Sequence, residues 1–186
     1  MTTIFLIRHA YTGIKEHLQQ PDTPLSRGGQ KQSEKLVKRL RRYKVKAVYT
    51  SEYQRAIETA KILAKNFGVQ VKAHKALNEI GVWASPTQLH SPTFSPREYE
   101  EELGIIHRAQ EQAFGFLESI SHANSGGKII VVAHGNIIRG IIAEALKAGV
   151  ETVVRMTVSN ASLSILEHEV KGDYFRLTLF NDTSHL

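Results

Sequence analysis

The chain has 186 residues, enough for one globular domain, and 41% of them are hydrophobic, enough for a real core. It contains no cysteine, which excludes disulfides, thiolate metal sites and a cysteine nucleophile, and which fits a reducing cytoplasmic environment. The net charge of +6 favours anionic partners, and no apolar run is long enough for a signal peptide or a membrane span, so no membrane partner is expected.

The first 73 residues alternate apolar runs with amphipathic segments. Apolar, β-branched runs predict strands at 3–7, 46–50 and 69–73. Apolar residues at helical spacing predict a helix that begins after Ser26, its N-cap, and ends near Tyr43. The same spacing predicts a second helix over 52–67, with Gly68 as its stop.

The remaining residues begin with a proline-containing stretch and end with a predicted hairpin. Residues 81–96 hold three prolines and many small polar residues, which predicts a loop. Helices are expected at 96–120 and 136–146, and strands at 128–133, 162–170 and 174–180. The last two strands flank Lys171-Gly172-Asp173 and are expected to form the hairpin.

Strands that alternate with helices predict an α/β fold, a three-layer sandwich with a mostly parallel central sheet and helices on both faces. We expect residues 1–186 to form a single domain, with the loop and helix at 81–120 as a cap over the substrate. In such sheets ligands bind outside the carboxyl ends of the strands. Residues at those strand ends are therefore the first candidates for a functional site.

A basic run at 38–46 follows the first predicted helix. A nucleic-acid surface is one interpretation of this run, but only Tyr43 is nearby as an aromatic stacking partner. Cations are also favoured at the carboxyl end of a helix by the helix dipole. We therefore expect a solvated helix end and no nucleic-acid partner.

Two histidines follow directly on predicted buried strands. His9 lies beside Arg8, whose charge is expected to lower the histidine pKa and keep the imidazole neutral, as a nucleophile requires. His134 is followed by Gly135, which allows close backbone approach, and by a helix start that favours an anion. A histidine hydrogen-bonded at a strand end is the alternative for each. If the two strands are neighbours, the pair predicts an anion pocket that contains a nucleophile.

Two further candidates lie at strand ends. Arg55 is about one turn into the second helix, where its guanidinium can bind two phosphate oxygens; a surface ion pair with Glu52 or Glu58 is the alternative. Glu79 follows the third strand, where a carboxyl group can protonate a departing alkoxide; an ordinary surface glutamate is its alternative.

Several separated segments together resemble the histidine phosphatase superfamily, in its phosphoglycerate mutase-like branch. Residues 8–12 are similar to the Arg-His-Gly-x-Ser/Thr signature, and residues 22–32 to the Asp-x-Pro-Leu-Thr-x-x-Gly-x-x-Gln stretch. Residues 51–60 resemble the Ser-x-x-x-Arg-Ala-x-x-Thr-Ala helix, and Glu79 and residues 133–135 match the last two blocks. Ala10 replaces the usual glycine of the signature, a change expected to be tolerated if the backbone needs no positive φ there.

The resemblance implies roles for the matching residues. His9 would be the nucleophile that becomes phosphohistidine, Glu79 the general acid, and Arg8, Arg55 and His134 the groups that hold the phosphoryl oxygens. The substrate-binding residues expected from it are Arg8, Thr12, Lys15, Thr23, Arg55, His134 and Gly135. Lys15 stands where many members have an asparagine that contacts phosphate, so its hydrogen bonding would differ.

The resemblance implies a phosphomonoester hydrolase that needs neither metal nor cofactor. No H-E-x-x-H pattern or similar ligand cluster is present, and the other seven histidines are expected at the surface or in packing. The segment between Glu79 and His134 is short for a mutase, which favours hydrolysis of a small phosphorylated substrate. Phosphoglycerate mutase activity and a non-catalytic relative that binds a phosphate ligand are the alternatives. The identity of the substrate and the oligomeric state are not predicted.

Overall fold

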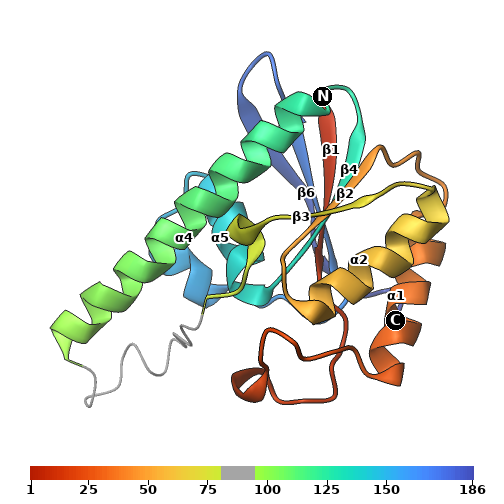
Figure 1. Ribbon diagram of the computed structural model, residues 1–186. Helices are drawn as coiled ribbons and strands as arrows, with labels where there is room; N and C mark the ends of the chain where they lie inside the picture. Colours follow the sequence, from red (N-terminus) through yellow and green to blue (C-terminus); the bar gives the residue numbers. More distant parts are fainter. Residues whose placement is uncertain (81–94) are drawn as a thin grey trace.

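The computed structural model describes residues 1–80 and 95–186, and Figure 1 shows their arrangement. The strands are β1 (Thr2–Arg8), β2 (Ala47–Thr50), β3 (Val71–Ala73), β4 (Lys128–Ala133), β5 (Leu163–Glu169) and β6 (Tyr174–Asp182). The α-helices are α1 (Arg27–Leu40), α2 (Gln54–Phe67), α4 (Pro96–Ala123) and α5 (Gly135–Ala145). Short 3-10 helices are η1 (Glu16–Leu18), η2 (Lys75–Leu77) and η3 (Val150–Arg155). Residues 81–94 of the predicted loop lie outside the described residues.

The described strands form one sheet in the order β3-β2-β4-β1-β5-β6. The first four strands are parallel, because β1 and β2 both pair with β4 in parallel and β2 pairs with β3 in the same way. β5 runs antiparallel to β1, and β6 antiparallel to β5. The mostly parallel sheet and the late hairpin are both confirmed.

The sheet lies between two helical layers (Figure 1). Ile4 and Leu6 of β1 pack in one core cluster with residues of α4 and α5, whereas Phe5 and Ile7 pack in another with α1 and α2. Each of these four side chains is at most 1% exposed, and burying one contributes about 1.5–3 kcal/mol. Because β1 is covered on both faces, its sequence is continuously apolar, and the three-layer prediction is confirmed.

Local signals at the helix ends behave as expected, with small shifts. Ser26 caps α1 through its side chain, and Gly68 ends α2 with a left-handed φ of 65°. The third strand starts later than predicted, at Val71, because the Val69 N–H donates to the Ala64 carbonyl and so belongs to the helix end. The first helix likewise ends at Leu40, earlier than predicted, with basic residues in its last turn.

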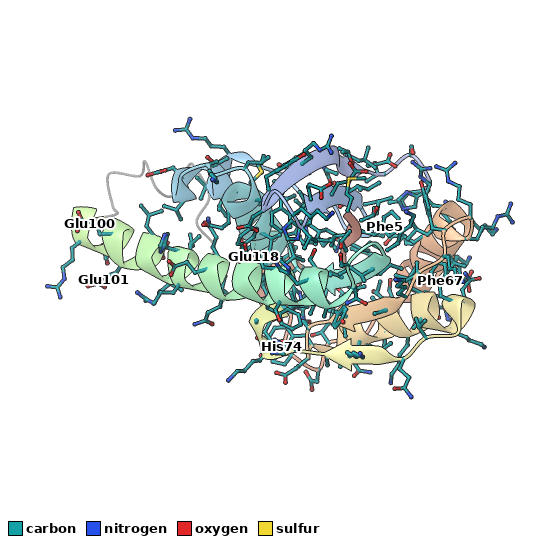
Figure 2. All side chains as sticks on the ribbon, turned by 90° about the horizontal axis from the view of Figure 1, so that it is seen from above. Phe5, Phe67, His74, Glu100, Glu101 and Glu118 are labelled. Carbon is teal, nitrogen blue, oxygen red and sulfur yellow. The ribbon has the colours of Figure 1, made fainter. Side chains whose placement is uncertain are left out.

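The long helix α4 packs against α5 along part of its length, and its amino-terminal end extends beyond the sheet (Figure 1). Figure 2 shows Glu100 and Glu101 on the extending end and Glu118 on the part that lies against the body. The helix begins with a capping box between Ser95 and Glu98. Of the helices in the described part of the chain, none has a stretch long and apolar enough to span a membrane.

Candidate active site

The two strand-terminal histidines meet at the carboxyl edge of the sheet. β1 and β4 are parallel neighbours with Arg8 opposite Ala133, so His9 and His134 follow side by side. Their ring centroids are 5.1 Å apart, and the rings are 2% and 0% exposed. The structure therefore brings together the pair on which the predicted anion pocket depended.

The ring of His9 is oriented by two hydrogen-bond partners. Its Nδ1 lies 2.9 Å from the Ala10 carbonyl, which can only accept, so the ring proton is on Nδ1. The lone pair of Nε2 then accepts a 3.2 Å hydrogen bond from Nε of Arg55. Burial, and secondarily Arg8, lowers the pKa of His9 to about 3. The imidazole is neutral as predicted, but burial is a larger cause than the neighbouring charge.

Two arginines border His9. Arg55, 4% exposed, also donates from Nη1 to the Gln20 carbonyl at 3.0 Å. The proposed surface pairing of Arg55 with Glu52 or Glu58 is therefore not what the structure shows. Arg8 is 9% exposed and forms an ion pair with Glu16 of η1.

His134 is oriented differently from His9. Its Nε2 lies 2.7 Å from Oγ of Ser51, and this Oγ accepts the Tyr53 N–H at 3.3 Å. With the Ser51 hydroxyl donating to Nε2, the ring proton is on Nδ1, which has no hydrogen-bond partner among the described residues. Burial first, and then His9 and the arginines, lowers the pKa of His134. A buried donor without a partner is rare, and this one belongs to the ring that lies next to His9.

Glu79 lies against the start of α5. Its Oε2 accepts the Asn136 N–H at 3.3 Å and its Oε1 accepts the Ile80 N–H at 3.1 Å. The helix start that was expected to face the anion thus holds this carboxylate. Burial raises the pKa of Glu79. A carboxyl group with a raised pKa beside a nucleophile is suited to general acid chemistry.

The second sequence block supports the loop that follows His9. A Cβ atom on Gly29 would lie 2.1 Å from the Tyr11 carbonyl oxygen, so only glycine allows α1 to approach this loop. The Tyr11 N–H donates to Oε1 of Gln32, and the Ser26 hydroxyl donates to the Tyr11 carbonyl. Ala10 has no positive φ, so its replacement of glycine is tolerated as expected. This block therefore positions the nucleophile loop.

Two adjoining hollows of about 130 and 210 Å³ open in front of these groups. Both are lined by Arg8, Glu16 and Glu79. The smaller one is also lined by His9, Arg55 and Tyr53, whereas Arg139 lines the larger one. Their size and charge suit a phosphate group and a small substituent.

Of the other predicted substrate residues, Gly135 lines the larger hollow beside the Arg8 guanidinium. His134, Thr12, Lys15 and Thr23 line neither hollow. Thr12 is buried, and its hydroxyl bonds Ile14 and Gln19 within the loop. Thr23 is buried and accepts the Gln20 N–H. Lys15 is exposed just before η1. The structure gives Thr12 and Thr23 roles in shaping this loop.

Sequence reasoning missed Glu16, Tyr53 and Arg139. Arg139 lies about one turn into α5, the position in its helix that had indicated Arg55 in α2, so the same signal was present for it. Glu16 carried no such signal, because its contact with Arg8 depends on how η1 folds back over the strand end. Tyr53 packs its ring 5.2 Å from His134 and 5.0 Å from the Arg55 guanidinium.

A neutral buried imidazole between arginines, at the carboxyl edge of a three-layer α/β sandwich, defines a protein of the phosphoryl-handling class. The chain belongs to the histidine phosphatase superfamily (branch 1), whose family model matches residues 4–183. This membership makes it an enzyme of the phosphatase or mutase type.

The relatives carry names of both types. A probable phosphoglycerate mutase GpmB of Yersinia enterocolitica is 25% identical over 205 residues, covering 100% of this chain and 95% of that protein. The mitochondrial serine/threonine-protein phosphatase Pgam5 of Caenorhabditis briggsae is 32% identical over 98% of this chain and 64% of that protein. The solved structure of Bacillus stearothermophilus YhfR matches with a TM-score of 0.82 and 24% identity, covering 100% of this chain and 99% of that one.

Proposed function

We propose that the protein hydrolyses a small phosphomonoester through a phosphohistidine formed on Nε2 of His9, with Glu79 as general acid and then general base. The observation that carries this proposal is the orientation of His9. Its Nδ1–H is bound to the Ala10 carbonyl, and its Nε2 lone pair lies 3.2 Å from Nε of Arg55 at the wall of the hollow. A fixed neutral imidazole beside a permanent cation is what attack on a phosphate anion requires.

In the first step, Nε2 of His9 attacks phosphorus while the bond from phosphorus to the leaving oxygen breaks. The protonated carboxyl group of Glu79, which lines the same hollow, transfers its proton to that oxygen and releases the alcohol. Burial raises the pKa of Glu79, which increases the fraction that carries the proton. The arginines and the Nδ1–H of His134 stabilise the charge on the phosphoryl oxygens.

In the second step, water attacks the phosphohistidine in line with the bond from nitrogen to phosphorus. The Glu79 carboxylate, now deprotonated, accepts a proton from this water as the bond to His9 breaks. Inorganic phosphate leaves, and the imidazole returns to its neutral form. Because the guanidiniums of Arg8 and Arg55 supply fixed positive charge, we propose that the reaction needs no metal ion or cofactor.

The cap belongs to the same proposal. We propose one domain over residues 1–186, in which the first part of the predicted cap at 81–120 covers the bound substrate, because Glu79 and Ile80 line the hollow directly before it. The later part of the predicted cap does not, because Ala113 and Leu117 of α4 pack in the core. Arg8 and Arg55 select for the phosphate group alone. The alcohol part of the substrate is open in this proposal, and so is the choice between a small molecule and a phosphoprotein.

A trapping experiment tests the proposal. Wild-type protein in excess EDTA is mixed with a ³²P-labelled aryl phosphate and quenched in alkali, which preserves phosphohistidine. We expect one label per chain, located on the peptide that contains His9, and steady release of phosphate. Glu79→Gln should form the labelled intermediate from an aryl ester, whose leaving group needs little protonation, and should release it slowly. Turnover without any label on His9 would refute the mechanism, and tight phosphate binding without turnover would indicate a non-catalytic relative.

Mutase activity is the second candidate, favoured by the match to a protein named as a probable phosphoglycerate mutase. A mutase returns the phosphoryl group to its substrate, whereas a hydrolase gives it to water. NMR of 3-phosphoglycerate during turnover separates the two. We expect inorganic phosphate as the product, and accumulation of 2-phosphoglycerate without phosphate release would favour the mutase.

A further inference from the structure

Three side chains of metal-ligating type meet at the opposite end of the sheet from His9. His122 lies in the last turn of α4, His168 in β5 and Asp173 in the turn between β5 and β6. Their ligating atoms lie within 4.8 Å of one another. His168 pairs with Thr2 at the start of β1, whereas His9 follows its end, so about 20 Å of strand separates the two places. Figure 1 shows the β5–β6 turn, the chain start and the end of α4 together at this edge.

The geometry of His168 points to a ligand. The residue is 0% exposed, and its ring stacks on Phe175 with centroids 4.0 Å apart. Its Nδ1 lies 2.7 Å from Oγ of Ser121, but its Nε2 has no hydrogen-bond partner among the described residues. That nitrogen faces Oδ1 of Asp173 at 3.5 Å. This contact is longer than an ordinary hydrogen bond and leaves the buried nitrogen poorly satisfied, a cost that a cation between Nε2 and Oδ1 would remove.

His168 also has a hydrogen bond at the ring nitrogen that would not bind the metal, as metal-binding histidines do. When Nδ1 donates its proton to Oγ of Ser121, the lone pair of the imidazole is on Nε2, directed toward Asp173. A hydrogen bond from the second ring nitrogen fixes both the tautomer and the ring orientation of a ligating histidine. Ser121 is in turn held in place at its carbonyl, which accepts a hydrogen bond from the Thr2 hydroxyl at 3.1 Å.

One of the ligand distances already fits a tetrahedral ion of zinc size. Zinc binds imidazole nitrogen and carboxylate oxygen at about 2.0–2.1 Å, so neighbouring ligands in a tetrahedron are about 3.3–3.4 Å apart. The 3.5 Å between His168 Nε2 and Asp173 Oδ1 is close to that value. The His122 ring lies 5.1 Å from the His168 ring in an edge-on arrangement. Because His122 and Asp173 are exposed, their side chains can turn by the small amount that closure requires.

The charge next to the cluster also favours a cation. A hollow of about 380 Å³ beside it is lined by three carboxylates, Glu118, Glu144 and Asp173, together with Lys147. Glu118 lies four residues before His122 on α4, and so on the same helix face. Figure 2 shows Glu118 where α4 packs against the body.

We propose that His122, His168 and Asp173 bind a zinc ion, with the fourth position taken by Glu118 or water. Two imidazoles and a carboxylate are a donor set that zinc accepts readily. The ion ties the end of α4 to the β5–β6 hairpin and leaves the phosphatase site untouched. This site departs from the expectation that His122 and His168 serve only surface or packing roles. Ligands 46 residues apart in the sequence carry no recognisable spacing.

Titration of zinc chloride into metal-stripped full-length protein, followed by calorimetry, tests the proposal. Loss of an outer-shell partner already weakens metal binding about 10- to 100-fold, so loss of a ligand should weaken it at least about tenfold. We expect one zinc ion per chain, and at least that weakening in His122→Ala and in Asp173→Asn. Both positions are exposed, so neither change disturbs the core.

Two control variants make the result specific. His107→Ala removes another exposed histidine of α4 that pairs with a carboxylate, Glu111, at 3.6 Å, and His9→Asn removes the imidazole at the far end of the sheet. Both should bind zinc like the wild type. Cobalt(II) in place of zinc should give the intense visible absorption of a tetrahedral site, and Asp173→Asn should lose this absorption. Zinc should raise the Tm of the wild type more than that of either ligand variant. The proposal is overturned if the wild type does not bind zinc, or if His122→Ala and Asp173→Asn both bind zinc as tightly as the wild type does.

Discussion

His9 after β1 and His134 after β4 come from the same local pattern, a buried strand that ends on a histidine. Both are buried, both have a lowered pKa, and their rings are 5.1 Å apart. Both rings carry their proton on Nδ1, but they differ in the partner of that proton. His9 binds the Ala10 carbonyl through Nδ1 and presents Nε2 to Arg55, whereas His134 is bound to Ser51 through Nε2 and keeps Nδ1 unpaired within the described part of the chain.

Burial and tautomer are the same for both rings, so their partners make the difference: the Nδ1 proton of His9 is used in the bond to Ala10, whereas that of His134 has no acceptor among the described residues. His9 lines the smaller hollow and presents its Nε2 to Arg55, whereas His134 lines neither hollow. The partner that selects the tautomer is local for His9, the next residue in the chain. For His134 it is Ser51, 83 residues away in the sequence.

The largest effect is expected from His9→Asn. Without the nucleophilic nitrogen no phosphohistidine forms, and kcat should fall by about 10⁴-fold or more. Stopped assays with an aryl phosphate, run beside a trapping experiment, measure both quantities. Residual turnover within tenfold of the wild type would remove the distinction between the two histidines.

A smaller effect is expected from His134→Asn. Removal of one donor to the phosphoryl oxygens should lower kcat by about 10²- to 10³-fold, while label still accumulates on His9. Ser51→Ala is the companion variant, because it removes the hydroxyl that selects the tautomer of His134 and leaves the ring in place. We expect Ser51→Ala to lower kcat by about tenfold with little change in KM. A His134→Asn protein that no longer forms phosphohistidine would show that the two rings act as one unit.

Acid stability provides a test that does not depend on turnover. The pKa of His9 is about 3 in the folded protein, against about 6.5 when unfolded, so between these values only the unfolded chain takes up the proton. The contribution of the neutral His9 to the free energy of unfolding is therefore fully present above about pH 6.5, and it is lost as the pH falls toward 3. His9→Asn and His134→Asn should each show a shallower fall of Tm between pH 6.5 and 4 than the wild type, and His107→Ala should follow the wild type. Parallel curves for all four proteins would contradict the burial argument.

The smallest effect is expected in front of His9, at Glu16. Its carboxylate pairs with Arg8, the cation that the phosphate needs, and its side chain is 45% exposed. Because a half-exposed ion pair contributes at most about 1 kcal/mol, Glu16→Gln should lower the inhibition constant for inorganic phosphate by about threefold. Competition assays against an aryl phosphate measure this constant. An unchanged or higher inhibition constant would show that the Glu16–Arg8 ion pair does not oppose phosphate binding.

Much of the fold is predictable because its signals are local. Strand β4 is predicted to the residue, since its run of apolar side chains is bounded by a glycine turn and by His134. Ser26 and Gly68 mark helix ends through bonds to their own neighbours. The predicted start of β3 is too early, because the N–H of Val69, directly after Gly68, bonds to the helix end before the sheet begins at Val71.

In the candidate site, too, some residues are predictable from local signals and others are not. His9, His134, Arg55 and Glu79 are recognisable because each stands at or near a strand end, where parallel strands bring their termini to one edge. Thr12 and Thr23 belong to the same motifs, yet their hydroxyls bond the loop and line neither hollow. Sequence similarity alone does not separate a residue that touches the ligand from one that holds the loop.

The sequence by itself determined the order of strands and helices, the two strand-terminal histidines and the stop of the second helix at Gly68. These features follow from side-chain periodicity, backbone conformation and the period-two alternation of a strand. Tertiary structure alone decided the tautomers of His9 and His134, the pairing of Arg8 with Glu16, and the meeting of His122, His168 and Asp173. The physical reason is that hydrogen bonds and burial depend on atoms brought within a few ångströms by folding, whatever their separation along the chain.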